Sequence, residues 1–303
     1  MLPAFGDMPQ VDLLADMAAF PLTAFPVKNH HPFGLHSHGS LVELVVVTHG
    51  SGKHLLEKGS FPIRPGDVFF VPAGLRHGYA DCNQLGLVNA ILDPARLDLP
   101  TLQLRRIPGY NALVSLEPEL RCQHRFESRL HLEESVLREV VAQLWEMYQE
   151  LLAKKPGYEL VVLSLFTVLL SKLARKYAEL TTPSSQGLTR LSELLEWLDL
   201  HYREPITIPD LLRRAHMTRS TLERHFHAAF GVAPWTYVRD LRLRKASLLL
   251  RNTDASVGEV AVQVGMKDAN YFSRAFLKYT GLSPTEYRRR SEANAVVPSL
   301  SPG

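Results

Sequence analysis

The chain has 303 residues, of which 46% are hydrophobic and 21% charged, a composition that suits a soluble globular protein with two domains. Its two cysteines, Cys82 and Cys122, are too few for a disulfide framework and lack zinc-finger spacing, so a reducing compartment is expected. The net charge of +3 is uneven: residues 188–290 carry 17 Lys and Arg against 11 Asp and Glu, whereas the remainder carries 17 against 20. This asymmetry favours a polyanionic partner for the C-terminal part.

No stretch is typical of secretion or of membrane insertion. The first residues lack a basic segment followed by an apolar core. The longest apolar run, over 160–170, has 11 residues, whereas a membrane-spanning helix needs about 20. We therefore expect a cytoplasmic protein that does not enter a membrane.

The N-terminal part, residues 1–128, has the pattern of a β domain. Residues 1–28 contain four prolines and are expected to form a lead-in. From His30 to Asp93, apolar and β-branched stretches alternate with turn residues, which predicts strands over 41–48, 53–57, 68–71 and 85–92. Gly50-Ser51-Gly52 is expected to be the turn of a hairpin between the first two strands. Short strands at this spacing favour a barrel or a sandwich.

Histidines and a glutamate recur at defined spacings in this β region. The pattern His36-x-His38-x4-Glu43-x6-Gly50 is followed by Gly66-x5-Pro72-x-Gly74-x2-His77. It resembles both signature motifs of the cupin double-stranded β-helix, with His30 and Asp81 in place of that family's first glycine and last asparagine. The resemblance implies a cupin-like barrel, and it maps the metal-binding positions of cupin enzymes onto His36, His38, Glu43 and His77.

These four side chains are chemically suited to one site. His36 and His38 are two apart on an expected strand, so both imidazoles point to one face. Glu43 and His77 are expected on neighbouring strands, and three imidazoles with one carboxylate leave open positions on a divalent Zn, Ni, Mn or Fe ion. Two interpretations stay open: a metal site, or residues kept to hydrogen-bond a ligand.

Two helices are expected over residues 129–180, after an irregular, proline-containing stretch over 93–126. Apolar residues recur through 131–153, and Pro156-Gly157 ends that helix. The second helix, over 158–178, is apolar nearly all round from Leu160 to Leu170, which predicts burial. The pair either covers the barrel alone or also forms a homodimer, and periodicity does not decide between these. Residues 181–187 have the composition of a flexible linker.

Residues 188–290 contain a duplicated unit. Shifted by fifty residues, Leu222, Arg224, Phe226, Gly231, Pro234 and Tyr237 coincide with Phe272, Arg274, Phe276, Gly281, Pro284 and Tyr287. Each copy predicts a helix-turn-helix whose helices are capped by Thr207 and Thr218 in the first copy and by Ser256 and Asp268 in the second. In the second copy Phe272, Phe276 and Tyr279 are expected to face inward. Residues 291–303 are expected to be a flexible tail.

The duplicated unit resembles the DNA-binding domain of AraC/XylS-type transcription regulators. The resemblance rests on both copies, on Arg242-Leu-Arg-Lys-Ala246 between them, and on the runs 265–276 and 281–288. Met266 stands where that family usually has Phe or Tyr. The resemblance implies a multidomain α and β protein, in which a cupin-like barrel with a helical pair precedes an all-α tandem helix-turn-helix domain. Its two recognition helices should enter successive major grooves of double-stranded DNA, about 34 Å apart.

Exposed polar residues on the second helix of each copy are the candidate DNA contacts. Arg suits guanine and Asn suits adenine, so contacts to base edges are expected from Arg219, Ser220, Thr221, Arg224, Asn270, Ser273 and Arg274. Phosphate contacts, which position the protein without specifying sequence, are expected from Lys267, Lys278 and Arg288–Arg290.

Within the family, residues 45–54, 76–92 and 194–198 are most similar to activators of L-rhamnose operons. This implies an activator that engages RNA polymerase and responds to a small polar effector, a sugar such as L-rhamnose. The expected effector lining is Phe33, His36, His38, Glu43, His77, Tyr79 and Asn89. The alternative is a metal-dependent cupin enzyme, a dioxygenase or an isomerase, tethered to a DNA-binding module. The chain offers no obvious separate acid or base beside the ligand set, and we expect a regulator rather than an enzyme.

Overall fold

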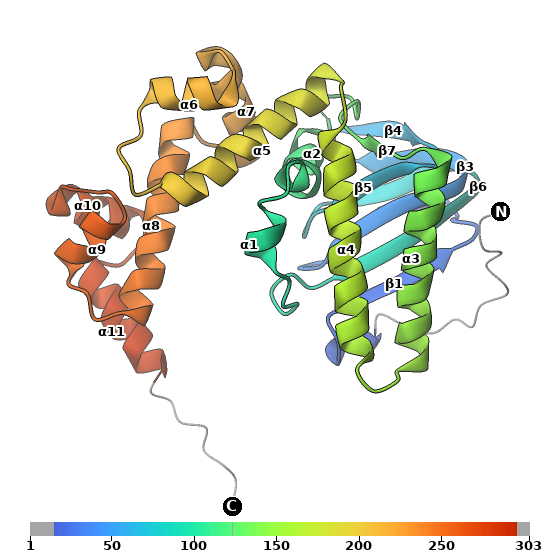
Figure 1. Ribbon diagram of the computed structural model, residues 1–303, viewed down its shortest axis with the longest axis horizontal. Helices are drawn as coiled ribbons and strands as arrows, with labels where there is room; N and C mark the ends of the chain where they lie inside the picture. The colour runs from blue at the N-terminus through green and yellow to red at the C-terminus, as the bar shows by residue number, and fades with distance from the viewer. Residues whose placement is uncertain (1–14, 123, 296–303) are drawn as a thin grey trace, which may run out of the picture. The chain divides into compact units, whose positions relative to one another are not determined.

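One antiparallel sheet organises the N-terminal half of the chain (Figure 1). The computed structural model describes residues 15–122 and 124–295, and it divides into two compact units between Ser192 and Glu193. In the first unit a short 3-10 helix, η1 (Ala15–Ala18), precedes the sheet. The strands are β1 (Leu22–Val27), β2 (Phe33–His36), β3 (Val42–Leu56), β4 (Gly59–Ile63), β5 (Asp67–Val71), β6 (His77–Leu92) and β7 (Leu130–His131).

Two long strands form the centre of this sheet. The strand order is β1-β6-β3-β5-β7, with β2 added to β6 and β4 added to β3. Strands β3 and β6 pair along their whole length, from Val42 opposite Leu92 to Leu56 opposite His77. The cupin-like β domain expected from the sequence is confirmed, although its strands at 42–56 and 77–92 are longer than predicted.

The predicted hairpin turn at Gly50-Ser51-Gly52 is wrong. Strand β3 continues through these residues, and its pairing with β6 shifts register between Val47 and Lys53. Gly50 has a φ of +70°, and a Cβ there would collide with the backbone of Gln84 on β6. The glycines therefore form a corner in one bent strand, where the backbones of two strands approach closely, instead of reversing the chain.

The two faces of the sheet have different neighbours. Cross-strand partners share a face, so Val45 lies on one face with Phe69 and Asn89. This inner face carries an apolar cluster that also includes Phe126. The residues that alternate with these along the strands, such as Leu44, Val46 and Ala90, point to the outer face and are equally buried. Burial of both faces explains the continuous apolar run over 44–47.

A helical pair packs against the sheet. Helix α3 (Glu134–Ala153) contacts β1, β3 and β6, and α4 (Tyr158–Ala178) runs beside it (Figure 1). Helix α4 has its predicted bounds, whereas α3 begins three residues later than predicted because His131 belongs to β7. The stretch expected to be irregular contains α1 (Thr101–Leu104), a π-helical turn η2 (Ala112–Leu116) and α2 (Glu117–Leu120).

The predicted flexible linker is mostly helical. Helix α5 (Pro183–His201) includes residues 183–187 in its first turns. The Ser185 backbone N–H donates to Oγ1 of Thr182 at 3.2 Å, and Pro183 suits a first helical position because its missing N–H is not needed there. The Thr-Pro-Ser-Ser segment therefore begins a helix. Its composition alone is the same as that of a flexible linker.

The second unit is helical throughout its described part. After α5 come α6 (Ile208–Ala215), α7 (Arg219–Phe230), α8 (Pro234–Asn252), α9 (Val257–Gln263), α10 (Ala269–Thr280) and α11 (Pro284–Ala295). Helix α11 extends to Ala295, so residues 291–295 of the expected tail are helical, and 296–303 lie outside the described residues. Among the described helices, none combines the length and apolarity that crossing a membrane would require.

Candidate DNA-binding helices and effector site

The two helix-turn-helix copies are built alike. Thr218 caps α7 and Asp268 caps α10 through side-chain oxygens that accept backbone N–H groups, as predicted. Gly231 and Gly281 end these helices with φ of +69° and +78°, values that favour glycine. Thr207 and Ser256 form capping boxes with Asp210 and Glu259 at the starts of α6 and α9.

The aromatic cores of the copies have nearly the same geometry. The ring centroids of Phe226 and Tyr237 lie 5.4 Å apart at 77°, and those of Phe276 and Tyr287 lie 5.3 Å apart at 84°. Both phenylalanines are fully buried. Tyr279, which was expected to face inward, is 41% exposed. The repeated core fixes α7 and α10 in equivalent positions within their copies.

Several candidate DNA contacts lie on exposed surface. Arg224 on α7 and Arg274 on α10 are exposed, and neither forms an ion pair with another described residue. Lys267, Asn270 and Lys278 are also exposed. These side chains are available to an external partner.

Other candidates are already engaged within the protein. Nε of Arg219 donates to Glu223 at 2.9 Å, and the Oγ1 of Thr218 lies 3.2 Å from the Ser220 hydroxyl and 2.9 Å from that of Thr221. The hydroxyl of Ser273 donates to the Ala269 carbonyl at 2.9 Å. These groups can contact DNA only by sharing or breaking those bonds.

Arg288, which was predicted to contact phosphate, is already engaged within the protein. Its Nε donates to the Leu250 carbonyl at 3.3 Å, and its Nη2 donates to the Ala255 carbonyl. It thus ties α11 to the end of α8 and the loop that follows. Arg242 acts similarly, donating to the carbonyls of Tyr202 and Glu204 at 2.8 Å each.

The sequence-predicted histidines meet in the first unit. Ring nitrogens of His36, His38 and His77 all lie within 4.8 Å of one another. Oε2 of Glu43 lies 3.4 Å from Nε2 of His38 and 3.2 Å from Nε2 of His77. His38 follows the end of β2, so its position depends on the turn after that strand and not on strand alternation. Four residues from three segments thus form one cluster.

Charge and burial differ across this cluster. Burial by itself raises the pKa of Glu43, but hydrogen bonds and charge from His38 and His77 outweigh it and lower that pKa to about 2. The hydrogen bond to Glu43 raises the pKa of His38, whereas burial lowers the pKa of His36. His77 and Glu43 are buried, while His36 and His38 are partly exposed. A partner would therefore approach the cluster from the side of His36 and His38.

The other predicted effector residues lie near the cluster or on the same inner face. Tyr79 is buried, with its ring 6.1 Å from that of His77 and 4.3 Å from that of His30. Phe33 is 56% exposed, and its ring lies 4.7 Å from that of His36. Asn89 is buried opposite Val45. Among the described residues, the Tyr79 hydroxyl and Oδ1 of Asn89 have no hydrogen-bond partner.

Sequence reasoning missed His54. It is fully buried, and its ring centroid lies 5.7 Å from that of His77 and 5.6 Å from that of Tyr79. It lies outside both motifs. Its position two residues before Leu56, the buried end of β3, places it on the same face as that leucine, and this was a signal that could have identified it.

Comparisons with known proteins cover both units. Residues 27–87 match the AraC-like ligand binding domain family, and residues 211–290 match a helix-turn-helix domain family. The HTH-type transcriptional activator RhaR of Enterobacter sp. (strain 638) is 30% identical over 276 residues, which are 90% of this chain and 94% of that protein. This chain belongs to the AraC family of transcription regulators.

Two further similarities accompany this AraC-family assignment. The RhaR activator of Escherichia coli (strain K12) is 30% identical over 285 residues, which are 92% of this chain and 96% of that protein. A structure of the DNA-binding domain of AdpA in complex with a target DNA is 31% identical over 36% of this chain and 98% of that chain, with a TM-score of 0.35. The AraC-family chain is a DNA-binding regulator with a ligand-binding domain, and the enzyme alternative is set aside.

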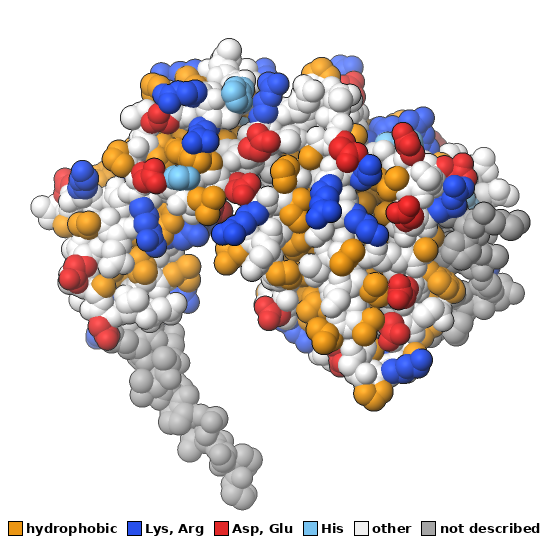
Figure 2. Space-filling view, viewed as in Figure 1, with side chains coloured by type: hydrophobic (Ala, Val, Ile, Leu, Met, Phe, Trp, Pro, Cys, Tyr) orange, Lys and Arg blue, Asp and Glu red, His pale blue; other side chains and the backbone are white. Residues whose placement is uncertain are grey.

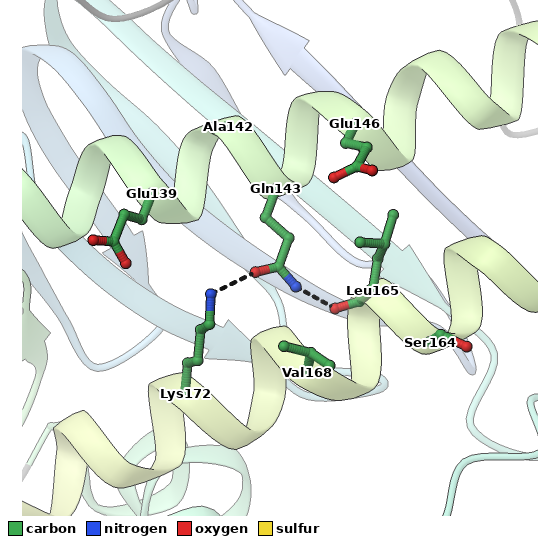
Figure 3. Close-up of a pocket in the computed structure, with 8 residues that line it drawn as sticks. All are labelled: Glu139, Ala142, Gln143, Glu146, Ser164, Leu165, Val168 and Lys172. Atoms are coloured by element: carbon green, nitrogen blue, oxygen red, sulfur yellow. Dashed lines mark hydrogen bonds between the residues drawn. The ribbon is translucent and has the colours of Figure 1, made fainter.

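This AraC-type regulator has a surface hollow between α3 and α4 (Figure 3). Its volume is about 550 Å³, and it is lined by Glu139, Ala142, Gln143, Glu146, Ser164, Leu165, Val168 and Lys172. Gln143 bridges the helices, because its Nε2 donates to the Leu165 carbonyl at 2.5 Å and its Oε1 accepts from Lys172 at 3.3 Å. Burial was predicted for 160–170, against the barrel or in a homodimer; in the single chain Leu160, Val161 and Val168 are 68%, 41% and 49% exposed.

Proposed function

We propose that this regulator activates transcription when a small neutral sugar, such as L-rhamnose, binds in the barrel. The observation that carries the proposal is the set of buried polar atoms on the inner face, beside three clustered histidines. An apolar effector would leave those atoms unpaired, at a cost of about 1–3 kcal/mol each, whereas sugar hydroxyls can pair with them. The RhaR relatives are named transcriptional activators, which supports activation over repression.

A divalent metal fits the same cluster. Ligand atoms on a tetrahedral zinc ion with bonds of about 2.0–2.1 Å are separated by about 3.3 Å. The distances of 3.2 and 3.4 Å from Glu43 to the two Nε2 atoms match that separation, and His36 would supply a third imidazole. We include Zn, Ni, Mn or Fe as the cofactor that His36, His38, Glu43 and His77 would hold. A six-coordinate Ni, Mn or Fe ion held by these four residues would keep two positions open for effector hydroxyls.

The protein would act as a homodimer that recruits RNA polymerase. Exposed apolar side chains of α4 lie among acidic and basic ones over α3 and α4 (Figure 2). The hollow is lined by Glu139 and Glu146 of α3 and by Lys172 of α4, so the surface carries both charges. A two-fold contact places the same patch on itself, and a patch with both charges and apolar residues is suited to this.

Transcription with purified components tests the proposed function. A duplex selected from a random pool by the full-length protein would serve as the operator upstream of a promoter. We expect L-rhamnose to increase transcript yield by RNA polymerase and to raise the thermal stability of the protein, because a ligand that binds only the folded state stabilises it. If no pentose or deoxyhexose has either effect while an aromatic or aliphatic compound does, the sugar assignment is wrong.

A further inference from the structure

Two buried side chains beyond the histidine cluster carry unsatisfied polar atoms. His54 on β3 lies directly opposite Tyr79 on β6, so their side chains share the inner face. Within residues 15–122 and 124–295, the two ring nitrogens of His54 have no hydrogen-bond partner, and the hydroxyl of Tyr79 has none either. Both side chains are essentially inaccessible, at 0% and 2% exposure. Buried polar groups in folded proteins nearly always form hydrogen bonds, so these atoms are expected to bond to a group from outside the chain.

The surroundings of His54 make the pairing requirement specific. Its ring lies 4.7 Å from that of Phe69, and its partner on β4 is Phe61. Both phenylalanines belong to the apolar cluster of the inner face. A leucine at position 54 would pack there without unpaired atoms, so packing alone does not account for a histidine.

The position of His54 relative to the cluster defines a direction. The centroids of the His36 and His77 rings are 4.4 Å apart, and those of the His54 and His77 rings are 5.7 Å apart. His36 is partly exposed, whereas His77 and His54 are buried. A ligand that enters at His36 and extends along His77 would therefore meet His54 and Tyr79 last.

We infer that His54 and Tyr79 form an inner subsite that hydrogen-bonds hydroxyl groups of the effector and selects neutral sugars over sugar acids. The inference rests on the proposed function, because it assumes that the barrel holds a sugar. A neutral imidazole offers one N–H donor and one acceptor nitrogen, and a hydroxyl can satisfy either one. A carboxylate only accepts, so it would leave the acceptor nitrogen of His54 unpaired.

Calorimetry on the full-length protein tests the inference, with L-rhamnose and D-galacturonate as probes. We expect His54→Leu and Tyr79→Phe each to weaken L-rhamnose binding about tenfold or more, because each removes hydrogen bonds to the ligand. His54→Gln keeps donor and acceptor capacity and should bind within a few-fold of the unaltered protein. Phe61→Leu is the matched control, since it changes packing opposite His54 without removing a polar atom, and it should leave affinity nearly unchanged.

The outcomes separate this inference from the proposed function. Unaltered affinity for L-rhamnose in both His54→Leu and Tyr79→Phe would overturn the inner subsite and leave the sugar effector standing. Tighter binding of D-galacturonate than of L-rhamnose would overturn the selectivity. Binding of neither probe by the unaltered protein would remove the subsite together with the sugar effector. Thermal unfolding checks that each variant is folded, and if His54→Leu is not, Tyr79→Phe alone decides.

Discussion

Oε2 of Glu43 lies 3.2 Å from Nε2 of His77, although their strand register places them far apart. Glu43 pairs with Ile91 at one end of the β3–β6 ladder, and His77 pairs with Leu56 at the other. Along a flat strand, the thirteen residues from Glu43 to Leu56 would span about 40 Å. The contact therefore forms across the interior of the bent sheet, and it depends on the corner at Gly50–Gly52.

This cross-barrel contact leads to a prediction about metal binding. Protein purified without a histidine tag is expected to contain or take up one equivalent of Zn, Ni, Mn or anaerobic Fe, as measured by elemental analysis. His77→Ala should lower the metal affinity at least tenfold. The affinity of the unaltered protein should also decrease as the pH is lowered, because the imidazoles must be deprotonated to bind. His49→Ala, a change of a histidine on β3 outside the cluster, is the control. Metal-free protein after reconstitution would leave the cluster as a ligand-binding site alone.

Arg224→Ala and Arg274→Ala should relax sequence specificity. Each side chain is exposed on the second helix of its copy, and a lost bidentate base contact costs about 1–3 kcal/mol. Binding selection on random duplexes should place the two relaxed positions about one helical turn apart. Lys278→Ala is the comparison: it should weaken all sequences alike and reduce the salt slope by about 1. Uniform weakening by the arginine variants would identify them as phosphate contacts.

A fragment of residues 183–295 should suffice for sequence-specific DNA binding. It begins at the start of α5 and ends with α11, so it contains both copies with their caps intact. Fluorescence anisotropy should show a preference for the selected duplex over random duplex, with affinity falling steeply as salt rises. A folded fragment with no such preference would contradict the role given to α7 and α10.

Val168→Glu should shift the full-length protein from dimer to monomer in analytical ultracentrifugation. Val168 is 49% exposed in the hollow between α3 and α4, and a charge there would be desolvated in a dimer. Val262→Glu is the matched control, since Val262 is 63% exposed on α9 in the other unit. If Val168→Glu and Val262→Glu dimerise to the same extent, the dimer interface does not include the hollow between α3 and α4.

Arg288→Met should destabilise the second unit by about 1–3 kcal/mol, because it leaves the Leu250 and Ala255 carbonyls without their donor. Urea denaturation of the 183–295 fragment measures the change. The neighbouring Arg289 is exposed, and Arg289→Met should change stability by less than about 0.5 kcal/mol. A similar small effect from both substitutions would show that the Arg288 bonds contribute little.

The sequence by itself determined the tandem helix-turn-helix and its helix ends. Thr218 and Asp268 were assigned correctly as caps, because an N-cap bond joins residues two or three positions apart. The burial of Phe272 and Phe276 on α10 followed from helical periodicity for the same local reason, whereas Tyr279 is exposed. The histidine cluster was also identified, since its members lie in two recurring motifs.

Tertiary structure decided what depends on residues distant in the chain. Gly50–Gly52 has the composition of a turn, and only the backbone of β6 beside it makes those residues a corner. Arg288 carries the charge of a phosphate contact, but carbonyls 33 and 38 residues away take up its donors. His54 lies beside the histidine cluster because the bent sheet brings it close to His77 and Tyr79. Local patterns fix conformations that a few neighbouring residues can satisfy, whereas strand register and burial are set by partners that only the folded chain supplies.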